Sequence, residues 1–237
     1  MSSRKFTRSV IAGGAAIAVA GGSYVIVTAT SGTSPAAASS SSAAAGGGGF
    51  RAGGGGSNAR SGPAAGGASG TVGSVSAAGF TMTTSAGQKV TVGEASSTTY
   101  RKGTSPASVS AITTGEPVLV LGTTSGTAIT ATQVIVHPAS GGTAASAAAK
   151  VIPFQRGAPA ASKQVGQIPA NYSEGSGTIV SGTAANKATE AALAAYPGGV
   201  VDRVVKLSNG EYEVHYIGVN WPHHVFVSQD FKAVGAE

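Results

Sequence analysis

Hydrophobic and polar residues alternate along residues 70–137, and this pattern predicts a small β-barrel. Phe80 and Met82 alternate with threonines, and apolar runs follow at 118–121 and 129–136. A period of two residues is the pattern of a half-buried strand. Glycine, serine and threonine separate the runs, so we expect about five short antiparallel strands closed into a barrel.

Residues 178–237 predict a second module that begins with a helix. Alanines recur on one face between 184 and 195, and Pro-Gly-Gly at 197–199 ends the helix. Strands are expected at 200–207, 211–217 and 224–228, the first two joined by a hairpin turn. The expected order is α-β-β-β.

Alternation within these strands predicts two different faces. If Ile217 lies opposite His224, then His215 and His224 are diagonal neighbours, about 7–8 Å apart. They share an open face with Ile217 and Phe226. The other face is expected to hold the helix and consists of Tyr212, Val214, Tyr216, Val225 and Val227.

Spaced glycines and apolar residues mark the first module. They are Gly70-x-Val72, Phe80-x-Met82, Gln88-x-Val90-x-Val92, Gly115-x-x-Val118-x-Val120-x-Gly122 and Ala131-x-x-Val134-x-Val136. This order resembles a bacterial extracytoplasmic OB-like domain family of unknown function. The resemblance implies a barrel and an exported setting, and it assigns no site.

A second set of spaced residues marks the C-terminal module. It consists of Ala188-x-x-Ala191-Ala192-x-x-Ala195, Tyr196-Pro197-Gly198, Tyr212-x-Val214 and Asp230-Phe231-Lys232. The module resembles a PepSY-type domain, which implies binding or restraint of a peptidase and sensing at the envelope. It departs from that pattern at 220–224, where Asn-Trp-Pro-His-His replaces a short turn.

The N-terminus predicts membrane insertion. Arg4, Lys5 and Arg8 precede residues 10–30, a stretch that at about 1.5 Å per residue spans roughly 30 Å, the thickness of a hydrocarbon core. Basic residues stay in the cytoplasm, so the rest of the chain is expected outside. The anchoring side chains are Val10, Ile11, Ile17, Val19, Tyr24, Val25, Ile26 and Val27. The alternative is a signal peptide cleaved after Val27-Thr28-Ala29, which would release a secreted protein.

The expected fold class is therefore α+β and multi-module. The domains are a membrane or signal helix at 1–30, a Gly/Ala/Ser linker at 31–69, the OB-like barrel at 70–137, an Ala/Ser/Pro linker at 138–177 and the PepSY-like module at 178–237. The 37 glycines fit such linkers. The net charge of +6 comes from the N-terminus and the linkers, so no nucleic-acid partner is expected.

Candidate chemistry is confined to the C-terminal module. The chain has no cysteine, no His-Glu-x-x-His motif and no Ser/His/Asp set, so neither an enzyme nor a cofactor is expected. The candidate binding residues are His215, Trp221, His223, His224 and Phe226. Trp221 is interpreted either as a cap on the core or as an exposed aromatic anchor. His215 and His224 lack a third ligand, so no metal site is expected.

These observations predict a non-enzymatic, membrane-tethered envelope protein. Its expected partner is a peptide or a protein, including an extracellular peptidase that it would regulate. Two alternatives are a structural protein associated with the cell wall and an envelope sensor that binds metal through the C-terminal histidines.

Overall fold

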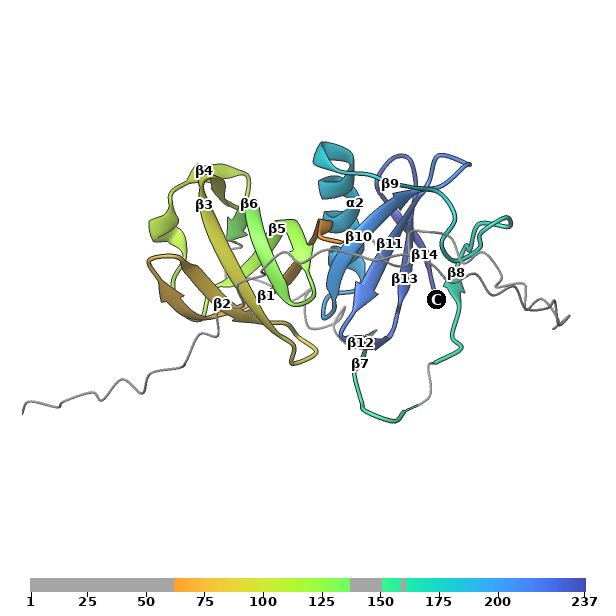
Figure 1. Ribbon diagram of the computed structural model, residues 1–237, viewed down its shortest axis with the longest axis horizontal. Helices are drawn as coiled ribbons and strands as arrows, with labels where there is room; N and C mark the ends of the chain where they lie inside the picture. Colours follow the sequence, from red (N-terminus) through yellow and green to blue (C-terminus); the bar gives the residue numbers. More distant parts are fainter. Residues whose placement is uncertain (1–61, 137–150, 159–160) are drawn as a thin grey trace, which may run out of the picture. The chain divides into compact units, whose positions relative to one another are not determined.

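The computed structural model describes residues 62–136, 151–158 and 161–237, which belong to one compact unit (Figure 1). Within them the chain is mostly β, with one α-helix, α2 (Gly182–Ala195). None of the described helices is long and apolar enough to cross a membrane. The anchor expected at residues 10–30 lies outside the described residues.

The α+β fold class expected from the sequence is wrong. Twelve strands form a single mixed sheet, and it runs through both of the expected modules. The two modules share a backbone ladder, because β1 (Ala64–Ser76) pairs with strands of both. The Ala/Gly-rich sequence at the start of β1 had been expected to belong to the linker.

Five strands close into a ring in the first half of the described chain. β1 pairs with β2, β2 with β3, β3 with β6 in parallel, β6 with β5, and β5 with β1. Their bounds are β2 (Gly79–Thr83), β3 (Lys89–Lys102), β5 (Pro117–Ser125) and β6 (Ala128–Val136), with β4 (Ser105–Ala107) added to β3. Phe80, Met82, Val90 and Val92 are buried inside, as the alternation predicts.

The second half continues the sheet from β1. The strand order is β1-β10-β11-β13-β14-β8, with the short strand β9 also on β10 (Figure 1). The bounds are β8 (Val165–Gly166), β9 (Thr178–Ile179), β10 (Val200–Lys206), β11 (Tyr212–Ile217), β13 (His224–Val227) and β14 (Ala233–Ala236). A separate pair joins β7 (Ile152–Pro153) to β12 (Val219–Trp221).

Glycines allow β1 to pair on both sides. A Cβ atom at Gly66 would clash with the carbonyl oxygen of Val201 in β10. A Cβ atom at Gly67 would clash with that of Val120 in β5. The low-complexity sequence here therefore permits close approach of three backbones instead of forming a linker.

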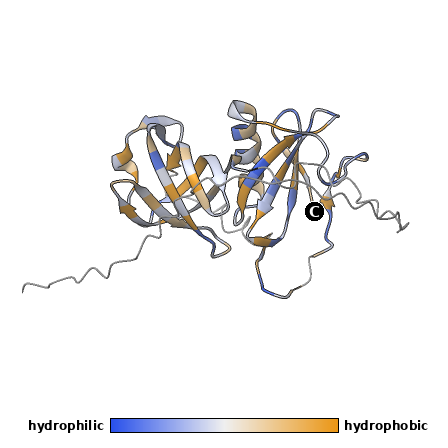
Figure 2. Ribbon diagram, in the orientation of Figure 1, coloured by the Kyte–Doolittle hydropathy of each residue, from blue (hydrophilic) through white to orange (hydrophobic). Residues whose placement is uncertain are grey.

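The face of the C-terminal sheet that holds α2 is apolar. Tyr212, Val214 and Tyr216 of β11 pack in one core with buried alanines of the helix. Small alanine side chains let the helix lie close to the strands. The expected division into two faces is confirmed for these residues, and Figure 2 shows hydrophobic and hydrophilic residues alternating along the strands.

Residues 161–177 cover the opposite face of this sheet, and we call them the cover segment. Ile168 and Tyr172 pack against Val205, Leu207 and Phe226 of that face. β8 lies within the cover segment and extends the sheet along β14. The face that the sequence predicts to be open is therefore partly occupied by the chain itself.

Candidate functional site

His215 and His224 lie directly opposite each other in β11 and β13. The expected register, with Ile217 opposite His224, is wrong by two residues. Gly218, with φ of 79°, begins the detour through β12 that separates the two strands. A shift of two residues keeps each side chain on its face, so alternation assigned the faces correctly while the loop set the register.

The register places a row of ionisable side chains across four strands. Arg203 of β10 pairs with His215, and His215 pairs with His224. His224 exchanges both backbone hydrogen bonds with Glu237, which follows β14. The neighbouring row on the same face contains Glu213, flanked by Val205 and Phe226.

An irregularity in β10 brings Asp202 to this face. The β10–β11 register shifts between Val201 and Arg203, which turns the Asp202 carboxylate toward His215. Asp202 Oδ1 lies 2.6 Å from His215 Nδ1, and Asp202 Oδ2 accepts a longer bond of 3.4 Å from Arg203. The Asp202 carboxylate accepts the Nδ1–H hydrogen of His215, which leaves Nε2 as the other polar atom of that ring.

Glu213 is buried in the middle of the sheet, with only 1% of its surface exposed. Its carboxyl group lies 3.5 Å from His224 Nε2, and the nearby Tyr172 hydroxyl acts to lower its pKa. Burial raises the pKa of the Glu213 carboxyl, against the opposing effect of the Arg203 and His215 charges. Glu213 is thus held toward its neutral form, in which it can donate a proton to a neighbour.

His224 is enclosed between two glutamates. Its Nε2 faces Glu213, and its Nδ1 lies 3.6 Å from Glu237 Oε1. Burial, followed by the charges of His215 and His223, lowers the pKa of His224 to about 3. Burial outweighs the attraction of the Asp202 carboxylate, so His224 is neutral at physiological pH.

Tyr172 of the cover segment lies over this row. Its ring packs edge-on against His224 and Phe226, with ring centroids 5.7 and 4.7 Å away. Burial raises the pKa of the Tyr172 hydroxyl, and the charges of Glu213, Glu237 and Glu174 raise it further. Besides the buried Glu213, the Glu174 and Glu237 carboxyl groups therefore act on one buried hydroxyl beneath the cover segment.

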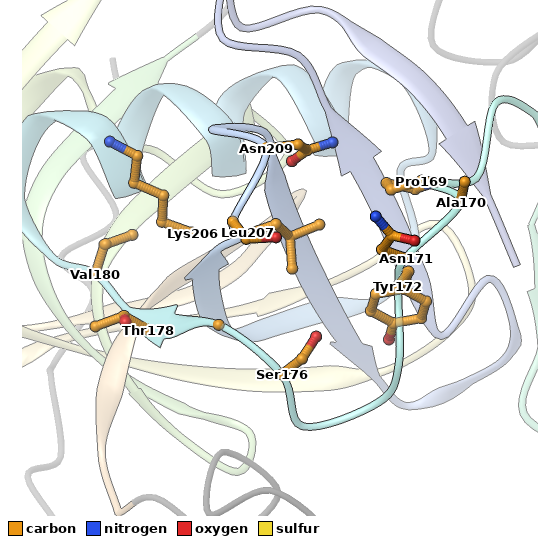
Figure 3. A pocket seen from close by; sticks show the side chains of 12 residues that line it. Pro169, Ala170, Asn171, Tyr172, Ser176, Thr178, Val180, Lys206, Leu207 and Asn209 are labelled. Carbon is orange, nitrogen blue, oxygen red and sulfur yellow. The ribbon is translucent and has the colours of Figure 1, made fainter.

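A cavity of about 680 Å³, which we call cavity A, opens beside Tyr172. It lies between the cover segment, β9 and the turn from β10 to β11. In Figure 3, Asn171 and Tyr172 lie across the cavity from Thr178 and Val180, with Leu207 between them. Lys206 is the only charged residue that lines it. Its walls are thus mainly neutral hydroxyl, amide and backbone groups around an apolar floor.

A second cavity, cavity B, has a volume of about 520 Å³ and lies over the ionisable row. The polar and ionisable residues that line it are Ser162, Lys163, Gln164, Glu174, His215, His223, His224 and Glu237. Among the described residues, no three histidine or carboxylate groups are placed to hold a metal ion together. Cavity B is therefore rich in hydrogen-bond acceptors that do not converge on one point.

The candidate residues chosen from the sequence fall in two environments. His215, His223 and His224 line cavity B. Trp221 and Phe226 are buried, so the interpretation of Trp221 as an exposed anchor is wrong. The indole of Trp221 donates a hydrogen bond of 2.7 Å to the Lys163 carbonyl and so holds the cover segment in place.

Sequence reasoning missed the acidic half of the site and its cover. Asp202, Glu213, Glu237 and Tyr172 were not among the candidates. An acid in the middle of an apolar strand, as in Tyr-Glu-Val at 212–214, was the one available signal for Glu213. No family model, curated protein or solved structure matches this chain.

Proposed function

We propose that this chain is a non-enzymatic exported protein that binds an extended polypeptide in cavity A. The observation that carries the proposal is the cavity itself, a partly apolar hollow with mainly neutral walls beside the short edge strand β9. Its volume of about 680 Å³ is in the range of small-ligand pockets, about 300–1,000 Å³. Among the described strands, β9 pairs only with β10.

An extended peptide fits cavity A and the edge of β9 better than a compact charged ligand does. A peptide can add to a sheet edge through backbone hydrogen bonds and place alternate side chains in a neighbouring hollow. Leu207 and Val180 provide an apolar floor for such a side chain, and the amide of Asn171 stands at the rim. The resemblance to PepSY-type domains supports an extracellular peptidase as the partner class, and residues 10–30 are the proposed tether.

Site-specific photo-crosslinking in cells tests the proposal. A photoreactive amino acid is placed at Asn171 or Thr178, which are exposed and line cavity A. The control position is Val109, which is half exposed and follows β4 in the barrel. We expect one polypeptide to be captured from both cavity positions and not from Val109, with mass spectrometry identifying it.

Comparison with the Val109 control decides whether crosslinking at cavity A is specific. No crosslinked polypeptide from Asn171 or Thr178, or the same products from Val109, would contradict the proposal. Capture of a peptidase would support the regulatory role, and capture of another polypeptide would keep the binding function and reject the peptidase as its partner.

A further inference from the structure

Cavity B has a chemistry that cavity A lacks, because ionisable acceptors line it. Glu174 from the cover segment and Glu237 from the end of β14 place two carboxylates against the single ammonium of Lys163. That ammonium lies 4.6 Å from the centre of the Trp221 ring, which holds it at the wall. The cavity therefore favours a cation.

His215 adds a directed acceptor to cavity B. Asp202 holds Nδ1 of His215 at 2.6 Å, while His215 itself lines the cavity. In the neutral ring with a hydrogen on Nδ1, the Nε2 atom carries a lone pair and accepts a hydrogen bond. In this neutral form, His215 adds an imidazole acceptor to the two carboxylates.

The spacing of these acceptors distinguishes between kinds of cation. A transition-metal ion needs donors that converge at about 2 Å from one point, and the described residues offer no group of three such donors. A guanidinium is planar and spreads five N–H donors over its edges, so it can reach separate acceptors at once. The ammonium of a lysine is compact and carries its N–H donors on one nitrogen, so it is neither planar nor able to reach widely separated acceptors.

We propose that cavity B is a pocket for an arginine side chain, with Glu174, Glu237 and His215 Nε2 accepting hydrogen bonds from its guanidinium. That this arginine belongs to the polypeptide bound at cavity A rests on the proposed function. The Glu174 and Glu237 carboxylates also act on the Tyr172 hydroxyl of the cover segment, so their negative charge lies on this side of the sheet.

Titration of the purified full-length chain with N-acetyl-arginine amide tests the pocket directly. The readout is the NMR signals of the histidine imidazoles, assigned by single His→Gln substitutions. We expect saturable shifts of the His215 and His224 signals at millimolar ligand, a binding free energy of about −4 kcal/mol. The matched neutral ligand, N-acetyl-citrulline amide, should cause no saturable shift.

Charge-removing variants locate the binding site. The double substitution Glu174→Gln and Glu237→Gln should raise the Kd for the arginine amide at least about tenfold, because it removes two charge-assisted acceptors. The control is Glu190→Gln, an exposed position on α2 on the far side of the sheet, which should leave the Kd unchanged.

Three results would overturn the proposal. They are an absence of saturable shifts, equal shifts with the citrulline amide, and zinc binding at micromolar concentration that the arginine amide does not compete with. The titration needs no partner, so its outcome is separate from that of the crosslinking experiment. Arginine binding without captured polypeptide would reject the proposed function and leave the pocket established.

Discussion

His224 shows how burial controls charge at single residues of this sheet. The folded protein lowers the pKa of His224 to about 3, far below the value of about 6.5 for an exposed histidine. Between about pH 6.5 and 3, His224 is therefore protonated in the unfolded state and neutral in the folded state. The groups that face the ring are Tyr172, Asp202, Arg203, Glu213, His215, His223 and Glu237.

We predict that acid destabilises the protein through His224. As the pH falls from about 6.5 toward 3, the free energy of unfolding should fall by up to about 1.4 kcal/mol per pH unit from this residue. His224→Gln should lose much less over the same range, because glutamine does not titrate. Urea unfolding at half-unit steps of pH measures the difference.

His223→Gln is the matched control for this prediction, since the neighbouring histidine is not enclosed between glutamates. Because burial is the largest cause of the lowered pKa of His224, this variant should keep most of the loss of stability in acid. Equal acid profiles for the wild type and His224→Gln would contradict the prediction, as would an imidazole signal of His224 that titrates between pH 5 and 8.

Sequence reasoning at the residue scale found the histidines and missed their partners. Alternation along 211–217 assigns His215 to the face opposite the helix, because a strand repeats every two residues. Asp202 joins the same site only because of the register shift in β10, and no pattern in the sequence marks that shift. Glu237 comes from the far end of the chain, and its place depends on β14.

At the scale of elements, the cover segment depends on two glycines. Gly166 in β8 has φ of 72°, and a Cβ atom there would clash with the Val234 carbonyl. A Cβ atom at Gly235 in β14 would clash with the carbonyl of Gln167. The two backbones therefore approach closely, and Gln167 donates a backbone hydrogen bond of 2.9 Å to Val234.

We predict that Gly235→Ala detaches the cover segment from β14. The added methyl group cannot coexist with the Gln167 carbonyl, so the ladder between β8 and β14 must open. Amide hydrogen exchange at Gln167 should become at least about tenfold faster, and the free energy of unfolding should fall by about 1–3 kcal/mol.

Gly93→Ala provides a matched control within a strand. A Cβ atom at Gly93 in β3 meets nothing closer than 4.0 Å, so this substitution should leave exchange at Gln167 unchanged. If Gly235→Ala also left that exchange rate unchanged, the close approach of β8 and β14 would not hold the cover segment.

The elements that sequence reasoning found and missed differ in composition. The strands at 200–206, 212–217 and 224–227 follow runs rich in valine and aromatic residues, so their presence could be predicted. The cover segment and the start of β1 consist of small and polar residues, which are also typical of linkers. Their positions come from backbone pairing with distant strands, which local composition does not encode.

At the scale of the whole described chain, β1 makes two halves into one cooperative structure. The same strand pairs with β5 in the barrel and with β10 in the C-terminal half. Leu119 and Leu121 of β5 also pack in one core with alanines of α2. Because backbone pairing and a core both cross the boundary, we expect the two halves to unfold together.

Gly66→Ala should weaken this coupling. The methyl group would clash with the Val201 carbonyl, so β1 must move away from β10 while its ladder with β2 remains. In the wild type, we predict that Trp221 fluorescence and amide exchange at Val92 report the same free energy of unfolding. In Gly66→Ala, the free energy of unfolding reported by Trp221 should fall by about 1–3 kcal/mol and separate from that of the barrel.

Gly62→Ala is the control because a Cβ atom there meets nothing within 4 Å. Two separate transitions in the wild type would contradict the shared strand as the source of cooperativity, since each half would then be stable without the other.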